Sequence, residues 1–148
     1  MLKGNILHPE ILAGLAAAGH LGQVLISDGN YPHNTSPNPR AKIVWANFMP
    51  GVLDCVTALK MVAQLVPIEE VVVMAPAKRG PYVMKHEPPI WTDFRKVLRE
   101  MSDFRGSLTP LAKPQFNERA RENHTCLVIA TGEIQIYANL LITIGVVR

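Results

Sequence analysis

The fold of this chain is decided by residues 20–34, which read HLGQVLISDGNYPHN. At their centre lies QVLI, residues 23–26, a short run of branched apolar side chains between Gly22 and Gly29. The run is too short for a helix, and its lack of alternation is typical of a strand buried on both faces. Such strands occur in parallel sheets that helices cover. We therefore predict an interior strand here.

Polar residues flank this predicted strand. Asp28 follows it, and ligands of open α/β sheets bind outside the carboxyl ends of strands, so Asp28 is well placed for function. His20 precedes the strand, just past an Ala-rich helical segment that Gly19 ends. A strand of about six residues spans roughly 20 Å. His20 and Asp28 of one chain are therefore expected near opposite ends, unless loops fold back.

The flanking pattern alternates strand and helix with short joins, which predicts crossovers and a largely parallel sheet. We expect a single three-layer α/β/α domain over residues 1–148. The expected helices are a segment opening at Pro9, about 52–65, 90–101 and 116–123, and the other expected strands are 42–45, 70–74, 126–130 and 140–144. Two proline-rich loops remain. The loop at 31–40 can close over a ligand, and the loop at 75–89 is a candidate active-site wall with Tyr82 and His86.

Composition excludes several classes of protein. No apolar stretch reaches the roughly 18 to 20 residues of a bilayer span, and no signal peptide is evident, so we expect a cytoplasmic protein and no membrane partner. Cys55 and Cys126 lie among apolar neighbours, as reduced thiols do. The net charge of +3 comes from dispersed basic residues, which argues against a nucleic-acid partner. The densest basic spot, Lys78-Arg79, is interpreted as a solvated loop, with contact to a phosphate or carboxylate as the alternative.

Common catalytic and cofactor motifs are missing. The sequence has no G-x-S-x-G, no phosphate-binding P-loop and no dinucleotide fingerprint. Its five histidines form no i, i+4 pair, and its two cysteines form no C-x-x-C. We therefore predict neither a metal site nor a cofactor.

Four stretches carry a resemblance to a known family. They are MLKG at 1–4, PEILAGLAAAGH at 9–20, SDGNYP at 27–32 and TGEIQIYANLL at 131–141. Together they resemble the D-ribose pyranase and L-fucose mutarotase family, in order and over nearly the whole chain. The resemblance implies a sugar mutarotase that works as a homo-oligomer, from dimer to decamer, with sugar sites near subunit boundaries.

The resemblance also changes the interpretation of individual residues. From spacing alone, His20 is interpreted as an exposed or capping histidine, Tyr137 as a packed ring and Asn139 as a turn residue. The family places its catalytic histidine at His20, and its sugar-binding positions at Asp28, Tyr137 and Asn139. Lys113 stands where relatives carry histidine or arginine. A lysine keeps a donor and a positive charge but loses the planar group.

Mutarotation requires a proton delivered to the ring oxygen and another removed from the anomeric hydroxyl, and a histidine can do both. The triplet Tyr137-Ala138-Asn139 resembles the ribose enzymes, whereas SDGNYP and the E-R-A helix resemble the fucose branch. We favour L-fucose or a related sugar as substrate. The alternatives are a D-ribose pyranase and a non-catalytic sugar-binding or transport-associated protein.

Overall fold

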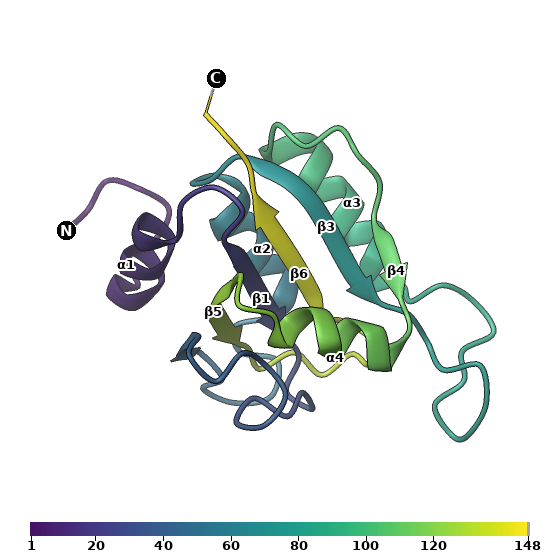
Figure 1. Cartoon of the computed structure of the whole chain (residues 1–148). Coiled ribbons are helices and arrows are strands. Elements are labelled where there is room, and N and C mark those ends of the chain that lie inside the picture. Colours follow the sequence, from purple (N-terminus) through teal and green to yellow (C-terminus); the bar gives the residue numbers. More distant parts are fainter. Residues whose placement is uncertain (148) are drawn as a thin grey trace.

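A computed structural model describes residues 1–147 of the chain. Arg148, which belongs to the predicted domain, lies outside the described residues. The elements in chain order are α1 (Pro9–Ala18), β1 (Gln23–Ser27), β2 (Lys42–Trp45), α2 (Cys55–Ala63), β3 (Ile68–Met74), α3 (Ile90–Met101), β4 (Thr109–Leu111), α4 (Lys113–Arg121), β5 (Thr125–Ala130) and β6 (Leu140–Ile144). The strands form one sheet in the order β2-β5-β1-β6-β3-β4 (Figure 1).

The predicted interior strand is β1, which lies between β5 and β6. It runs parallel to β5 and antiparallel to β6. β6 is also antiparallel to β3, whereas β2 is parallel to β5 and β4 is parallel to β3. The prediction of a largely parallel sheet is confirmed, with β6 as the one reversed strand.

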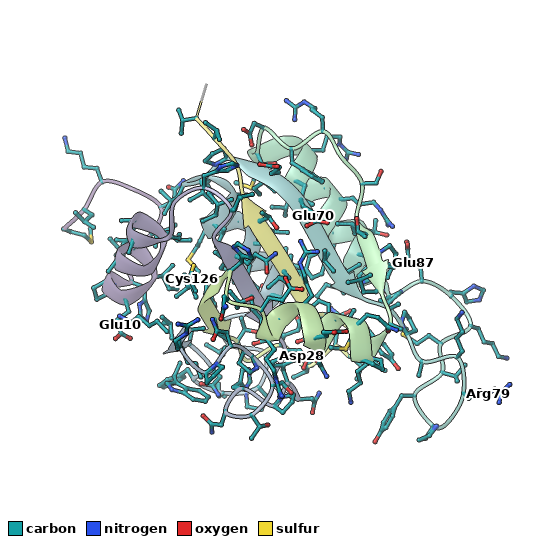
Figure 2. All side chains as sticks on the ribbon, viewed as in Figure 1. Glu10, Asp28, Glu70, Arg79, Glu87 and Cys126 are labelled. Atoms are coloured by element: carbon teal, nitrogen blue, oxygen red, sulfur yellow. The ribbon has the colours of Figure 1, made fainter. Side chains whose placement is uncertain are left out.

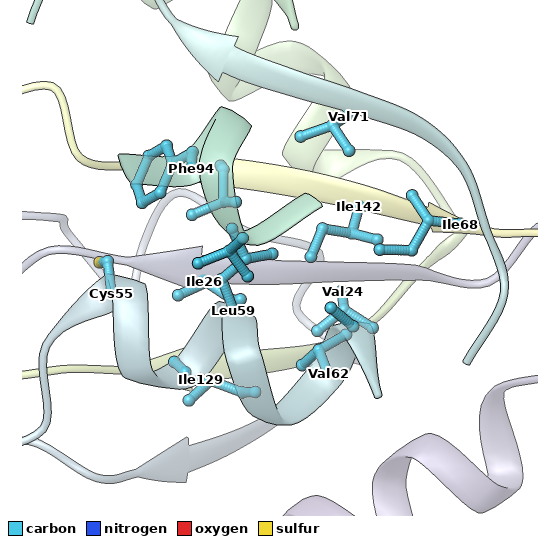
Figure 3. Close-up of a cluster of buried hydrophobic side chains, with 14 of the residues drawn as sticks. Val24, Ile26, Cys55, Leu59, Val62, Ile68, Val71, Phe94, Ile129 and Ile142 are labelled. Carbon is cyan, nitrogen blue, oxygen red and sulfur yellow. The ribbon is translucent and has the colours of Figure 1, made fainter. Parts of the chain in front are cut away.

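Helices cover both faces of the sheet, which confirms the α/β/α architecture. Alternate residues of β1 point to opposite layers: Val24 and Ile26 belong to the core beneath α1, α2 and α3, and Leu25 to the core beneath α4. Figure 3 shows the larger core, where Leu59 and Phe94 from the helices meet the strand residues. All five residues of β1 are buried, as its unbroken apolar run predicts.

Element bounds differ from the sequence-based ones where capping and prolines decide them. Strands 42–45 and 140–144 and the helix at 90–101 have the predicted bounds. α2 begins at Cys55 rather than near residue 52, because Asp54 is its N-cap and accepts a hydrogen bond from the Thr57 amide at 2.6 Å. α4 begins at Lys113 rather than 116, with a proline in its first turn. Strand β4 was not predicted.

The connection between β5 and β6 shapes the site. β5 ends at Ala130, opposite Ser27 of β1, and β6 begins at Leu140, opposite Ile26 on the other side of β1. Residues 131–139 must therefore cross over the carboxyl end of β1. This crossing brings the predicted TGE and YAN stretches over the residues that follow the strand. In the described part of the chain, no helix is long and apolar enough to cross a membrane.

Candidate functional site

The crossing segment places two predicted site residues in direct contact at the carboxyl end of β1. The Asn139 amide nitrogen donates to Asp28 Oδ2 at 2.7 Å, and the Asp28 backbone N–H donates to Asn139 Oδ1 at 2.9 Å. Asp28 Oδ1 also accepts from the Asn30 N–H at 2.9 Å. Neither Asp28 nor Asn139 can turn without losing these bonds, so the pair is held in one orientation. Figure 2 labels Asp28 at this end of the sheet.

The Asp28 carboxyl is buried, with 3% of its surface exposed. Burial raises its pKa above the ordinary value of 3.8, and the nearby Glu133 carboxylate adds to the rise. Hydrogen bonds from Asn30, Asn139 and Ala138 oppose the rise without cancelling it. Asp28 therefore combines a fixed orientation with a strong acceptor oxygen, which is suited to holding a sugar hydroxyl.

Tyr137 belongs to the same segment, but its hydroxyl is occupied. It donates to the Tyr82 carbonyl at 2.7 Å and accepts from the Ala77 N–H at 3.0 Å. Its backbone is left-handed, with φ of 60°, and its carbonyl accepts from the Trp91 indole at 3.2 Å. The ring packs into the core beneath α4. We call Asp28, Tyr137 and Asn139 the carboxyl-end cluster.

A supporting turn precedes this cluster. Glu133 is buried, and its carboxylate accepts from the amides of Ile134 and Gln135, both at 2.9 Å, and of Cys55 at 3.3 Å. A Cβ at Gly132 would collide with the carbonyl oxygens of Met49 and Val52, so only glycine fits there. The sequence indicated Gly132 and Glu133 only as part of a family motif. In the structure they hold the turn that precedes the carboxyl-end cluster.

Tyr31 and His33, which sequence reasoning left unassigned, lie beside this region. Both are buried, and the Tyr31 hydroxyl and His33 Nε2 have no hydrogen-bond partner among residues 1–147. Their rings meet edge to face at 5.7 Å, and His33 meets Trp45 in the same way at 5.5 Å. Burial raises the pKa of Tyr31 to about 12 and lowers the pKa of His33. The sequence offered one indication that these two residues belong to the site, because both lie in the stretch that directly follows Asp28.

Lys113 also lies at the carboxyl end of the sheet, but no hydrogen bond or ion pair among residues 1–147 joins its side chain to the cluster. It is the first residue of α4 and follows Leu111, which pairs with Met74 at the ends of β4 and β3. Its side chain is exposed, as is that of His86. Lys113 therefore stays a predicted sugar contact.

His20 lies at the other end of β1. The next residue, Leu21, donates its N–H to the Ile144 carbonyl where β6 ends. His20 Nε2 lies 3.1 Å from Glu69 Oε2, with 47% of the histidine side chain exposed. An open groove of about 1220 Å³ lies beside it, which we call the His20 groove; its lining comes from residues 63–69, 100–103 and 145–147. The structure thus separates His20 from Asp28, as strand length predicts.

No group of three or more potential metal ligands occurs in residues 1–147. The expectation of a site without metal or other cofactor stays a prediction.

Comparison with known proteins identifies the family of this chain. Residues 1–147 match the model of the RbsD / FucU transport protein family. The chain belongs to this family. This confirms the resemblance seen in the four sequence stretches.

Named relatives in the RbsD / FucU family include both sugar classes. A fucose mutarotase of Mus musculus is 30% identical over 97% of this chain and 94% of its own length. A D-ribose pyranase of Photorhabdus laumondii is 27% identical over 99% of this chain and 99% of its own. The structure of a fucose mutarotase in complex with L-fucose, from Streptococcus pneumoniae, superimposes with a TM-score of 0.82 at 23% identity, over 99% of this chain and 100% of that one. At this identity the last likeness shows the fold.

Proposed function

We propose that this protein is a sugar mutarotase that interconverts the cyclic forms of a free monosaccharide. The observation that carries the proposal is the interlocked Asp28–Asn139 pair, in a chain of the RbsD / FucU family. The favoured substrate is L-fucose or a related sugar, since relatives that are 30% and 29% identical to this chain are named fucose mutarotases. We place the activity in one cytoplasmic domain spanning residues 1–148.

The reaction opens and closes the sugar ring by moving two protons. His20 acts as general acid on the ring oxygen and as general base on the anomeric hydroxyl, and ring closure reverses both transfers. Asp28 accepts a hydrogen bond from a sugar hydroxyl and fixes the orientation of the sugar. Asn139 and the ring of Tyr137 position it, and Lys113 supplies a charged donor at the rim. The uncatalysed reaction is accessible, so an acceleration of about a hundred- to ten-thousand-fold suffices.

His20 can serve the carboxyl-end cluster if a second copy of the chain supplies it. We propose that the protein is a homo-oligomer, such as a decamer, with pockets shared between neighbours. Charge supports this contact: among residues 1–147, the lining of the His20 groove has three acidic residues, Glu69, Glu100 and Asp103, and no lysine or arginine. The 75–89 loop beside the cluster carries Lys78, Arg79 and Lys85, and its one acid, Glu87, is paired with Arg95.

Exposed apolar side chains also support a contact between copies. They lie on the segments around the carboxyl end of β1, which in a monomer would face water: Trp45, Phe48, Met49, Val52, Ile134 and Ile136. Apolar surface of this kind usually marks an interaction site.

Saturation-transfer NMR on a panel of sugars that includes L-fucose and D-ribose tests the activity. We expect exchange between cyclic forms of L-fucose to be accelerated, and His20→Ala to remove the acceleration. Faster exchange of D-ribose than of L-fucose would favour the pyranase alternative. Binding of a sugar without faster exchange would favour the non-catalytic alternative. Prolonged chelation should leave the exchange rate unchanged, and restoration by a divalent ion would overturn the assignment without a cofactor.

Mixing inactive subunits tests the shared pocket. His20→Ala and Tyr137→Ala proteins are each expected to be inactive, and their mixture should regain activity if one pocket draws on two chains. Sedimentation at micromolar concentration measures the assembly directly. A fully active monomer would contradict this part of the proposal and leave the mutarotase activity standing.

A further inference from the structure

The 75–89 loop leaves the sheet after β3 and extends away from the body of the molecule (Figure 1). Most of its residues are exposed, from Ala77 to Val83 in an unbroken run. Ala77 and Val83 pair with each other, which closes this run into a small ring of chain. Met84 is its apolar contact with the core beneath α4. A segment with so little buried surface needs another attachment to keep one position.

Tyr137 provides that attachment. Its hydroxyl bonds to Tyr82 and to Ala77, at the two sides of the closed run. A phenol has one proton to donate, and the Tyr82 carbonyl takes it. The rest of the residue is fixed, because its ring is buried in the core and its carbonyl is bonded to Trp91. The hydroxyl is therefore directed at the loop, whereas Asn139, two residues on, is bonded to Asp28.

We propose that Tyr137 is a positioning residue whose hydroxyl latches the 75–89 loop beside the carboxyl-end cluster. The loop then forms one wall of the sugar pocket, and the Tyr137 hydroxyl acts on sugar affinity through the loop. This role rests on the proposed function, because it concerns the same sugar site. It differs from a direct hydrogen bond between that hydroxyl and the sugar.

The test breaks the latch from each side. Tyr137→Phe keeps the buried ring and removes the hydroxyl. Ala77→Pro keeps Tyr137 and removes the N–H that the hydroxyl accepts. Ala77→Ser, which retains the N–H, and Tyr82→Ala, which retains the carbonyl, are the matched controls. Amide hydrogen exchange over residues 76–84 is measured on each protein without sugar, and sugar affinity is measured separately on the same samples.

We expect faster exchange over residues 76–84 in Tyr137→Phe and in Ala77→Pro, and exchange as in the wild type in both controls. Sugar affinity should fall in both latch variants, by roughly two- to twelvefold, the range for one neutral hydrogen bond. The double variant should lose little more than either single one, because both changes open the same latch.

Three results would overturn the proposal, either the latch itself or its effect on sugar affinity. Unchanged exchange over the loop in Tyr137→Phe would show that the hydroxyl does not hold it, and this conclusion stands even if Ala77→Pro fails to fold. Loss of affinity in Tyr137→Phe alone, with the loop freed in both variants, would mean a direct bond to the sugar. A freed loop with unchanged affinity would show that it is not a wall. If the wild type binds no sugar, the proposed function fails, whereas the exchange data still decide whether the latch exists.

Discussion

The two ends of β1 are built in different ways. At the carboxyl end, Asp28 and Asn139 are 3% and 4% exposed and share two hydrogen bonds, inside a turn that Glu133 supports. At the amino end, His20 is about half exposed, and its ring contacts the Glu69 carboxylate. The proposed binding pair is thus fixed within one chain. The histidine that we propose for proton transfer is about half exposed.

This contrast separates two requirements of catalysis. A site that recognises hydroxyls gains from preorganisation, because the cost of orienting its polar groups is met during folding. A general acid and base must exchange its proton with the solvent or the substrate, so an exposed histidine suits the task. We therefore expect changes at the carboxyl end to alter affinity and rate together, and changes at the amino end to alter rate.

The largest expected effect is that of His20→Ala. It should lower catalysed exchange by about a hundred- to ten-thousand-fold, because proton transfer is lost, and leave sugar affinity within about tenfold. Exchange rate and affinity are measured on one sample by NMR. The matched control is His124→Ala, an exposed histidine that directly precedes β5 and has no assigned role, which should retain the wild-type rate. A wild-type rate in His20→Ala would remove this residue from the mechanism.

Asp28→Asn comes next and addresses the other end of β1. The change removes the charge and replaces one of two acceptor oxygens by an NH2 group, so Asp28 loses either the bond from the Asn139 amide nitrogen or the bond from the Asn30 N–H. We expect affinity and rate to fall together by about 10- to 150-fold, as for a lost charge-assisted bond of about 1.5–3 kcal/mol. Titration calorimetry and exchange NMR measure the two quantities. Asp93→Asn, exposed in the first turn of α3, is the control, and equal affinity in the two variants would contradict the role of Asp28.

The sequence predicted the layers because burial of β1 on both faces leaves no other place for the helices. It predicted strands 42–45 and 140–144 with their observed bounds, since each is mainly apolar, with Lys42 at the start of the first and Thr143 within the second. β4 escaped prediction because it has three residues, one of them Pro110, and two are exposed. The antiparallel direction of β6 was also not predicted, because an apolar run does not indicate whether a strand pairs in parallel or antiparallel.

The same limit explains what could be predicted of the site. His20 and Asp28 were correctly expected at opposite ends, because strand length fixes their separation. The contact of Asp28 with Asn139 could not be predicted, since it depends on residues 131–139 crossing over β1. The hydrogen bonds of the Tyr137 hydroxyl also could not be predicted from the sequence. Tyr82 is 55 residues away in the chain and carries no pattern that indicates the contact.

A smaller effect is expected on stability, from His33 at the carboxyl end. Burial lowers its pKa below 6.5, so the unfolded chain binds more protons than the folded one in the window below pH 6.5. The free energy of unfolding should therefore fall as pH falls through that window, by at most about 1.4 kcal/mol per pH unit. Urea unfolding between pH 7.5 and about 5 measures this. His33→Gln should flatten the slope, and an equal slope in both proteins would assign it to other groups.

The smallest effect is expected from Glu69→Gln at the amino end. The carboxylate orients the His20 ring, but both side chains are about half exposed, and such pairs contribute about 0.2–1 kcal/mol. The rate should fall by no more than about fivefold, with sugar affinity unchanged, because glutamine still offers an oxygen to the ring. Glu100→Gln removes a charge from the same groove without a contact to His20, and it serves as the control. A loss of exchange rate as large as that of His20→Ala would contradict this prediction. It would show that the assembled protein holds His20 as firmly as Asp28, and that the two ends of β1 differ in the isolated chain alone.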